Sequence, residues 1–203
     1  MPGTMALNLD PSKTALLVMD YQPVTLGFLD DPTPLVSSAA ATADAVRESG
    51  GRVGYVRVAF NDADYAGFPE GHIMGDRVKE SRPNMDADSP TTALHEGLGV
   101  RDGDIVVRKS RVSAFSTTDL HEQLTNLGIT TLVLAGVHTS GVVLTTVREA
   151  HDLDYRVIVL SDGGADPDNA VHDFLIEKIF PKQADLATTG ELLSVLLAEA
   201  GAR

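Results

Sequence analysis

The sequence predicts one α/β domain spanning residues 1–203, with a mostly parallel sheet between two layers of helices. Short apolar runs alternate with helix-like segments along the whole chain. These runs are nearly continuous in Val, Ile and Leu, as is typical of parallel strands that are buried on both faces. No repeat, low-complexity tract or linker divides the chain, and 203 residues with 43% hydrophobic side chains are enough for one core.

Each predicted strand is an apolar run bounded by turn residues, and each predicted helix has helical spacing with a stop signal such as Gly50-Gly51 or Gly128. The strands are expected at Thr14–Asp20, Arg52–Ala59, Asp104–Lys109, Thr130–Gly136 and Tyr155–Ser161, with Ala184–Thr188 as an edge strand. The helices are expected at Pro34–Ser49, Thr118–Leu127, Gly141–Leu153, Asp168–Ile179 and Thr189–Ala200.

The segment Asn61–Glu96 has no sustained period and is rich in Gly and Pro. Connections of this length are usually functional lids or carry short helices of their own. We therefore expect the segment to cover the pocket.

Composition excludes several classes of function. The net charge of −13 disfavours nucleic-acid binding, because steering toward a phosphate backbone would be repulsive. The absence of cysteine excludes disulfides, thiolate metal sites and thiol nucleophiles. The six histidines show no metal-binding spacing, and no glycine-rich turn follows the first strand, so we expect neither a metal nor a cofactor. The same missing turn argues against a nucleotide-binding oxidoreductase.

The chain shows no basic signal segment at Met1–Ser12 and no apolar run near the roughly twenty residues that a membrane span needs. We expect a cytoplasmic protein with a small-molecule ligand.

Ligands of open parallel sheets bind beyond the carboxyl ends of the strands, and chemically useful residues stand at three such ends. Asp20 ends the first strand and Lys109 ends the third, so each is either a solvated or capping residue or half of a buried acid/base pair. In the turn Gly136–Val142, Thr139 or Ser140 either caps the next helix or faces the pocket, where backbone N–H groups could bind an oxyanion.

Two arginines also have either a structural or a functional interpretation. Arg57 and Arg111 are either surface charges or contacts for an anionic substrate.

Four segments in order resemble the isochorismatase-like hydrolase family, also called the cysteine hydrolase family. They are Thr14–Gln22, Lys109–Leu120, Gly136–Thr139 with Thr146 and Ala150 after it, and Tyr155–Asp166. The resemblance covers nearly the whole chain and implies the three-layer, Rossmann-like α/β/α fold of that family. It also implies a homo-oligomer, a dimer or a tetramer.

The resemblance implies a catalytic set of Asp, Lys and Cys, in which Asp20 and Lys109 match the first two. Val142 stands at the cysteine position, so the nucleophile is replaced. The resemblance further implies a cis peptide at Val137–His138, with backbone donors around Val137, His138 and Thr139, and pocket positions at Gln22 and Phe115.

Three functions remain open from the sequence. The first is a thiol-independent hydrolase of an ether, amide or ester, in which Asp20 is the acid or base and Lys109 its electrostatic partner. The second is a catalytically inactive member that binds a small ligand or a protein partner. The third uses the hydroxyl of Thr139 or Ser140 as nucleophile, although no His–Asp relay is evident in the sequence.

Overall fold

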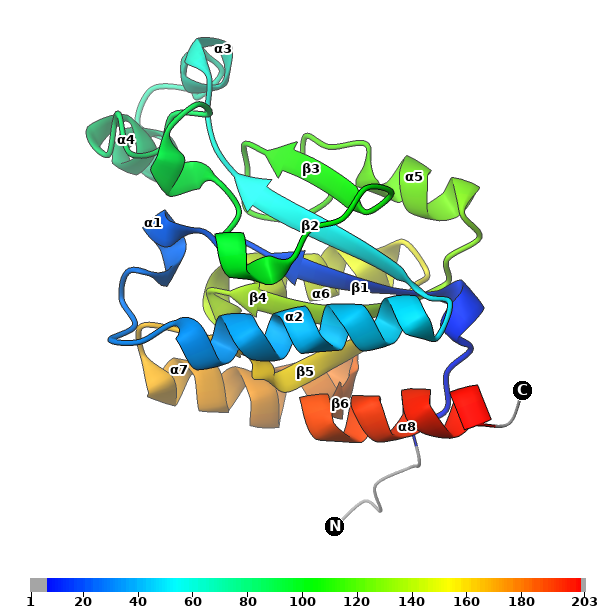
Figure 1. Cartoon of the computed structure of the whole chain (residues 1–203). Helices are drawn as coiled ribbons and strands as arrows, with labels where there is room; N and C mark the ends of the chain where they lie inside the picture. Colours follow the sequence, from blue (N-terminus) through cyan, green and yellow to red (C-terminus); the bar gives the residue numbers. More distant parts are fainter. Residues whose placement is uncertain (1–6, 202–203) are drawn as a thin grey trace.

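The computed structural model describes residues 7–201 and has a parallel six-stranded sheet between two helical layers (Figure 1). The strands are β1 (Thr14–Met19), β2 (Arg52–Val58), β3 (Ile105–Lys109), β4 (Thr131–Val137), β5 (Arg156–Ala165) and β6 (Asp185–Ala187). The α-helices are α1 (Pro23–Leu26), α2 (Thr33–Glu48), α3 (Asp62–Ala66), α4 (Ile73–Glu80), α5 (Leu120–Asn126), α6 (Leu144–Asp152), α7 (Asn169–Phe174) and α8 (Thr189–Gly201).

Short helical turns of other types complete the chain. The 3-10 turns are η1 (Pro11–Lys13), η2 (Pro90–Thr92), η3 (Glu96–Leu98) and η6 (Phe180–Lys182), and the π turns are η4 (Thr139–Val143) and η5 (Leu175–Ile179). Within residues 7–201, no helix is long and apolar enough to span a membrane. Residues 1–6, where the sequence predicts no signal segment, and residues 202–203 lie outside the described part.

The strand order is β3-β2-β1-β4-β5-β6, and every pairing is parallel. The chain winds outward from β1 to β3 and then restarts beside β1 with β4. The carboxyl ends of β1 and β4 therefore form the topological switch point at which this kind of sheet binds ligands.

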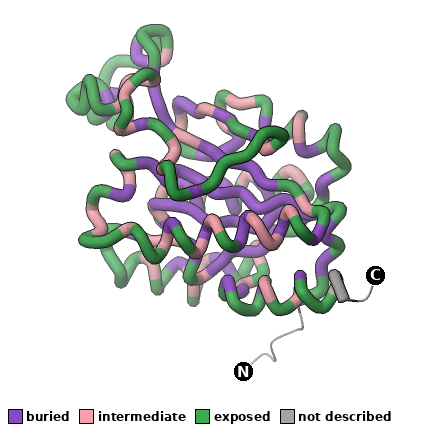
Figure 2. The backbone as a smooth tube through the Cα atoms, in the orientation of Figure 1, coloured by how far each residue is buried: buried purple, intermediate pink, exposed green. Residues whose placement is uncertain are grey.

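The core has two halves, one on each face of the sheet, and the central strands β1 and β4 are buried along their whole length (Figure 2). Along β1, Leu17 and Met19 pack toward α5 and α6, whereas Leu16 and Val18 pack toward α2 and α8. This alternation is the two-residue period of a strand that is covered on both sides. The α/β/α architecture predicted from the apolar runs is confirmed.

Two element boundaries differ from the prediction near the switch point. The strand predicted to end at Ser161 continues to Ala165, where Gly164 pairs with Gly136 of β4. A Cβ on Gly164 would lie 2.7 Å from the Gly136 carbonyl oxygen, so glycine here allows close strand approach rather than a turn. The helix predicted from Gly141 begins earlier, as the π turn η4 at Thr139.

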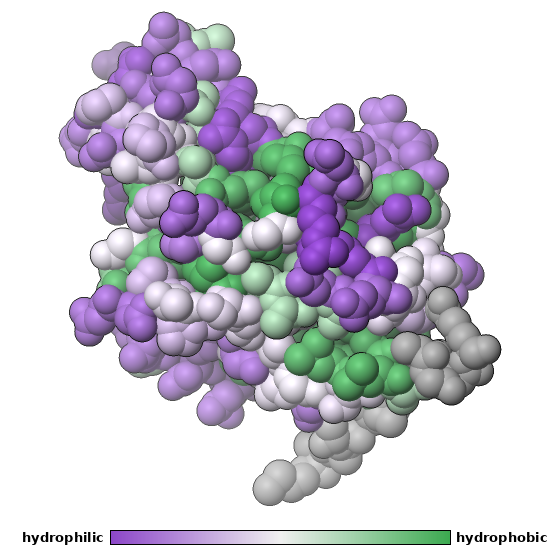
Figure 3. Space-filling model, viewed as in Figure 1, coloured by the Kyte–Doolittle hydropathy of each residue, from purple (hydrophilic) through white to green (hydrophobic). Residues whose placement is uncertain are grey.

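The segment predicted as irregular carries α3 and α4, which project from the carboxyl end of the sheet (Figure 1). We call residues 61–89 the α3–α4 lobe. Its visible surface is mostly hydrophilic (Figure 3), and its interior is a small separate apolar cluster that includes Phe68 and Tyr65. The lobe is thus a packed unit with short helices, one of the two forms expected of so long a connection.

Candidate functional site

An ion pair between Asp20 and Lys109 lies at the carboxyl end of the sheet. Asp20 directly follows β1, and its backbone has a φ of 60°, a left-handed conformation that aspartate tolerates better than most side chains. Its Oδ2 lies 2.8 Å from the Nζ of Lys109, and the side chains are 7% and 2% exposed. The two catalytic candidates chosen from the sequence are therefore in direct contact.

Lys109 reaches Asp20 from two strands away, because β2 lies between β3 and β1. Its Nζ also donates to the Arg111 carbonyl oxygen at 3.2 Å. These two acceptors hold the ammonium group in place and compensate part of the cost of burying it.

The other carboxylate oxygen of Asp20, Oδ1, is buried and has no hydrogen-bond partner within residues 7–201. Burial raises the pKa of the Asp20 carboxyl above its ordinary value, and the Lys109 ammonium only partly offsets this. A carboxyl with a raised pKa and one oxygen free of hydrogen bonds is suited to take up and release a proton during a reaction.

Val142 lies in η4 and belongs to the same core cluster as Met19, the residue that precedes Asp20. A Cβ placed on Gly136 would touch both Val142 Cγ1, at 3.3 Å, and the methyl of Met19, at 3.2 Å. The Val142 side chain is 2% exposed and belongs to the apolar core. The position that the resemblance assigns to a cysteine is therefore occupied by an inert branched side chain.

The peptide between Val137 and His138 is cis, as the resemblance implies. Three amides of the turn that follows are already used: Ser140 donates to Asp166 Oδ2 at 2.7 Å, and Gly141 and Val143 donate to the His138 carbonyl oxygen. An oxyanion site here would therefore depend on the remaining amides, those of Thr139 and Val142.

The imidazole of His138 packs edge-on against Phe28 at a centroid distance of 5.0 Å. Its charge, when present, favours the ionised forms of both Asp20 and Asp166. Burial by itself would raise the pKa of Asp166, but the hydrogen bonds that Ser140 and Asp168 donate outweigh it and hold this pKa below its ordinary value.

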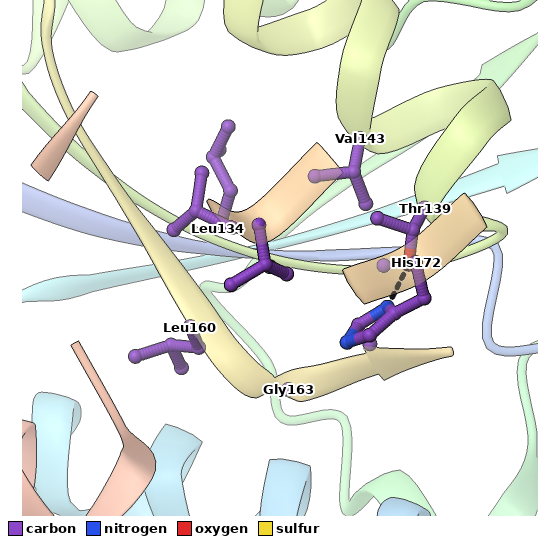
Figure 4. Close-up of a pocket in the computed structure, with 10 residues that line it drawn as sticks. Leu134, Thr139, Val143, Leu160, Gly163 and His172 are labelled. Carbon is purple, nitrogen blue, oxygen red and sulfur yellow. Dashed lines mark hydrogen bonds between the residues drawn. The ribbon is translucent and has the colours of Figure 1, made fainter. Parts of the chain in front are cut away.

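A contact that sequence reasoning missed joins Thr139 to His172. Thr139 Oγ1 lies 2.7 Å from His172 Nδ1 (Figure 4), and His172 Nε2 lies 3.2 Å from the Ser161 carbonyl oxygen. The two side chains line a small pocket between β4, β5 and η4. His172 is 33 residues from Thr139, so no local pattern could reveal the pair.

Two predicted pocket residues have other surroundings. The Gln22 amide is fully buried, and its atoms bind the backbone of Val58 and the carbonyl oxygen of Thr92, so Gln22 has a structural role. Phe115 stacks on Tyr155, which precedes β5 at the opposite end of the sheet, with ring centroids 6.0 Å apart. Its ring also lies edge-on to His121, with centroids 6.4 Å apart, and the pocket role of Phe115 stays a prediction.

Among residues 7–201, no group of three or more His, Asp or Glu side chains is arranged to hold a metal ion. Two acids of the α3–α4 lobe, Asp62 and Asp64, pair with Arg82 and Arg108.

Comparison with known proteins gives a consistent result. The isochorismatase domain profile matches residues 14–191. The uncharacterized isochorismatase family protein YwoC of Bacillus subtilis is 34% identical over 92% of this chain and 96% of its own. The ureidoacrylate amidohydrolase RutB of Methylobacterium radiotolerans is 31% identical over 93% and 83%. The maleamate amidohydrolase of Pseudomonas putida is 26% identical over 93% and 89%.

Solved structures agree. An isochorismatase family protein from Burkholderia thailandensis has a TM-score of 0.79 and 29% identity over 93% of this chain and 97% of its own. A cysteine hydrolase from Pseudomonas syringae has a TM-score of 0.80 over 96% of each chain and, at 23% identity, is evidence of the fold alone. The chain therefore belongs to the isochorismatase family, a family of hydrolases.

Proposed function

We propose that this chain hydrolyses a small ether, amide or ester without a thiol, through Asp20 and Lys109. The observation that carries the proposal is the buried 2.8 Å ion pair, in which one carboxylate oxygen of Asp20 remains uncommitted. Isolated buried charges are costly, and a pair of this kind is weak evidence for stability, so a chemical use accounts for it better.

Water is the nucleophile in this proposal, because no cysteine exists in the chain. For an amide or ester, the Asp20 carboxylate takes a proton from water as the water oxygen bonds to the carbonyl carbon. The proton then passes to the departing nitrogen or oxygen as its bond to carbon breaks. For a vinyl ether, protonated Asp20 donates to the substrate and water completes the hydrolysis. Lys109 stabilises the ionised form of Asp20 in each cycle.

A hydrolysis screen with purified protein tests the proposal. The panel is isochorismate, small esters, and small amides including maleamate and ureidoacrylate, the compounds for which two relatives are named. We expect wild-type turnover that both Asp20→Asn and Lys109→Ala abolish. Asp185→Asn is the matched control, because Asp185 also pairs with a cation at 2.8 Å but is half exposed. Turnover that survives either change at the site would refute the assignment.

The alternative is an inactive member that binds a small ligand or a protein partner, and the core packing of Val142 favours it. Its expected result is no turnover on any panel compound by the wild type. Val142→Cys then separates the cases, since a thiol at the position where the family resemblance implies a cysteine, with Asp20 and Lys109 intact, should create amide hydrolysis if the rest of the site is competent.

A further inference from the structure

Two arginines near the Asp20–Lys109 pair have no carboxylate partner. Among described residues, neither Arg57 nor Arg111 forms an ion pair, although the chain has 29 acidic residues and a net charge of −13. Arg57 is next to Arg108 across the β2–β3 pairing, and burial together with repulsion from Arg108 lowers the pKa of Arg57. The carboxyl ends of β2 and β3 therefore carry an excess of positive charge.

The acids at this edge already have cation partners. Asp20 binds Lys109 at 2.8 Å, and Asp64 binds Arg108 at 2.6 Å. Arg57 uses its two terminal nitrogens on the carbonyl oxygens of Thr92 and Ala87. Arg57 is thus satisfied by backbone, and Arg111 is the cation with hydrogen-bonding capacity to spare.

Arg111 is held in place without being neutralised. Its guanidinium carbon lies 3.8 Å from the ring centroid of Phe68 in the α3–α4 lobe. One terminal nitrogen, Nη1, donates to the Ser110 carbonyl oxygen at 2.6 Å, and no other N–H of this side chain has a partner within residues 7–201. A stacked guanidinium retains its charge and its planar fork, which matches the geometry of a carboxylate.

The same residue touches the catalytic lysine through its backbone, because the Arg111 carbonyl oxygen accepts the 3.2 Å hydrogen bond from Lys109 Nζ. We infer that Arg111, braced by Phe68, recognises a carboxylate on the substrate beside the bond that is hydrolysed. This inference rests on the proposed function and gives it a substrate class, namely small acids that carry a second, hydrolysable group.

Substituting the Arg111 side chain leaves its backbone carbonyl on Lys109, so binding and chemistry should separate. With maleamate as substrate, Arg111→Met should raise KM about 10- to 100-fold, the loss expected for a charge-assisted contact, with little change in kcat. Arg111→Lys should restore part of the affinity. With maleamide, which lacks the carboxylate, wild type and Arg111→Met should have similar KM values.

A binding titration tests the inference without turnover. Maleate is titrated calorimetrically into wild type, Arg111→Met, Phe68→Leu and the control Arg52→Met, an exposed arginine at the amino end of β2. We expect maleate to bind wild type and Arg52→Met alike, Phe68→Leu more weakly, and Arg111→Met at least tenfold more weakly. Thermal unfolding confirms that each variant is folded.

The outcomes for Arg111 and for the catalytic pair are distinct. Maleate binding that depends on Arg111, in a protein that turns over none of the panel, supports carboxylate recognition and refutes the proposed hydrolysis. Wild type that does not bind maleate, or Arg111→Met that binds it as tightly as wild type, overturns the role of Arg111 whatever the catalytic result.

Discussion

Replacing Lys109 by methionine should destabilise the protein strongly, because it leaves the Asp20 carboxylate buried without a cation. At 2.8 Å and an effective dielectric constant of about 20, the gross attraction between the two charges is about 6 kcal/mol. Part of this offsets desolvation, and breaking a buried pair on one side typically costs about 3–5 kcal/mol. We expect a cost of that size at pH 8.

The cost should shrink in acid, and the sign follows from proton binding. Without the ammonium group, the pKa of Asp20 rises further above its ordinary 3.8. At pH values between 3.8, the ordinary pKa in the unfolded state, and the raised pKa in the folded state, the folded state holds more protons than the unfolded state. The free energy of unfolding therefore falls as pH rises through this window, by about 1.4 kcal/mol per pH unit at most. The variant should thus lie closer to wild type at pH 5 than at pH 8.

Urea unfolding followed by circular dichroism at pH 5, 6, 7 and 8 measures both effects. Arg156→Met is the matched control, because Arg156 and Asp185 are also 2.8 Å apart but 42% and 50% exposed, and such pairs contribute about 1 kcal/mol or less. The reasoning would be refuted if Lys109→Met lowered the free energy of unfolding by no more than the control does. It would also be refuted if that loss did not grow from pH 5 to pH 8.

Three further changes probe the turn beside the pair. Gly164→Ala should cost about 1–3 kcal/mol in urea unfolding, since its Cβ would meet a backbone oxygen at 2.7 Å, whereas Gly190→Ala, with its nearest atom at 4.0 Å, should be nearly neutral. Asp166→Asn should cost about 1.5–3 kcal/mol at pH 7 by weakening the hydrogen bond from Ser140. Because the pKa of Asp166 is lowered, its stabilisation is present above pH 3.8 and lost below, so the variant and wild type should converge in acid, and a constant gap would count against this account. Thr139→Val should keep kcat on any substrate found in the screen, because water is the proposed nucleophile; complete loss would favour the hydroxyl.

The fold and the two charged candidates were readable from the sequence because each rests on a local pattern. Apolar runs fixed the strands, and once the strands are parallel their carboxyl ends meet, which brings Asp20 and Lys109 to the same edge. Their contact is confirmed at 2.8 Å. The catalytic use of the pair stays a prediction.

What the sequence could not supply are contacts that depend on side-chain direction between distant segments. Phe115 stacks on Tyr155, and the Gln22 amide forms hydrogen bonds with the backbone of Val58. Neither contact could be predicted, because the partners lie far away along the chain. The Thr139–His172 contact and the stacking of Arg111 are of the same kind.

Stability alone and catalytic use make opposite predictions for a double variant of the ion pair. Asp20→Asn with Lys109→Met removes both charges and keeps a residue that tolerates the φ of 60° at position 20. Replacing a whole buried pair by well-packed hydrophobic side chains is often neutral or stabilising by about 1–4 kcal/mol, because the desolvation of both ions is relieved. An asparagine amide keeps much of this relief, since a neutral polar group costs far less to bury than a carboxylate. We expect the double variant to recover most of the stability that Lys109→Met loses, while turnover of every panel compound is absent. A double variant that remains about 3 kcal/mol below wild type in urea unfolding would mean that the pair holds the fold together, and the main argument for its chemical use would fail.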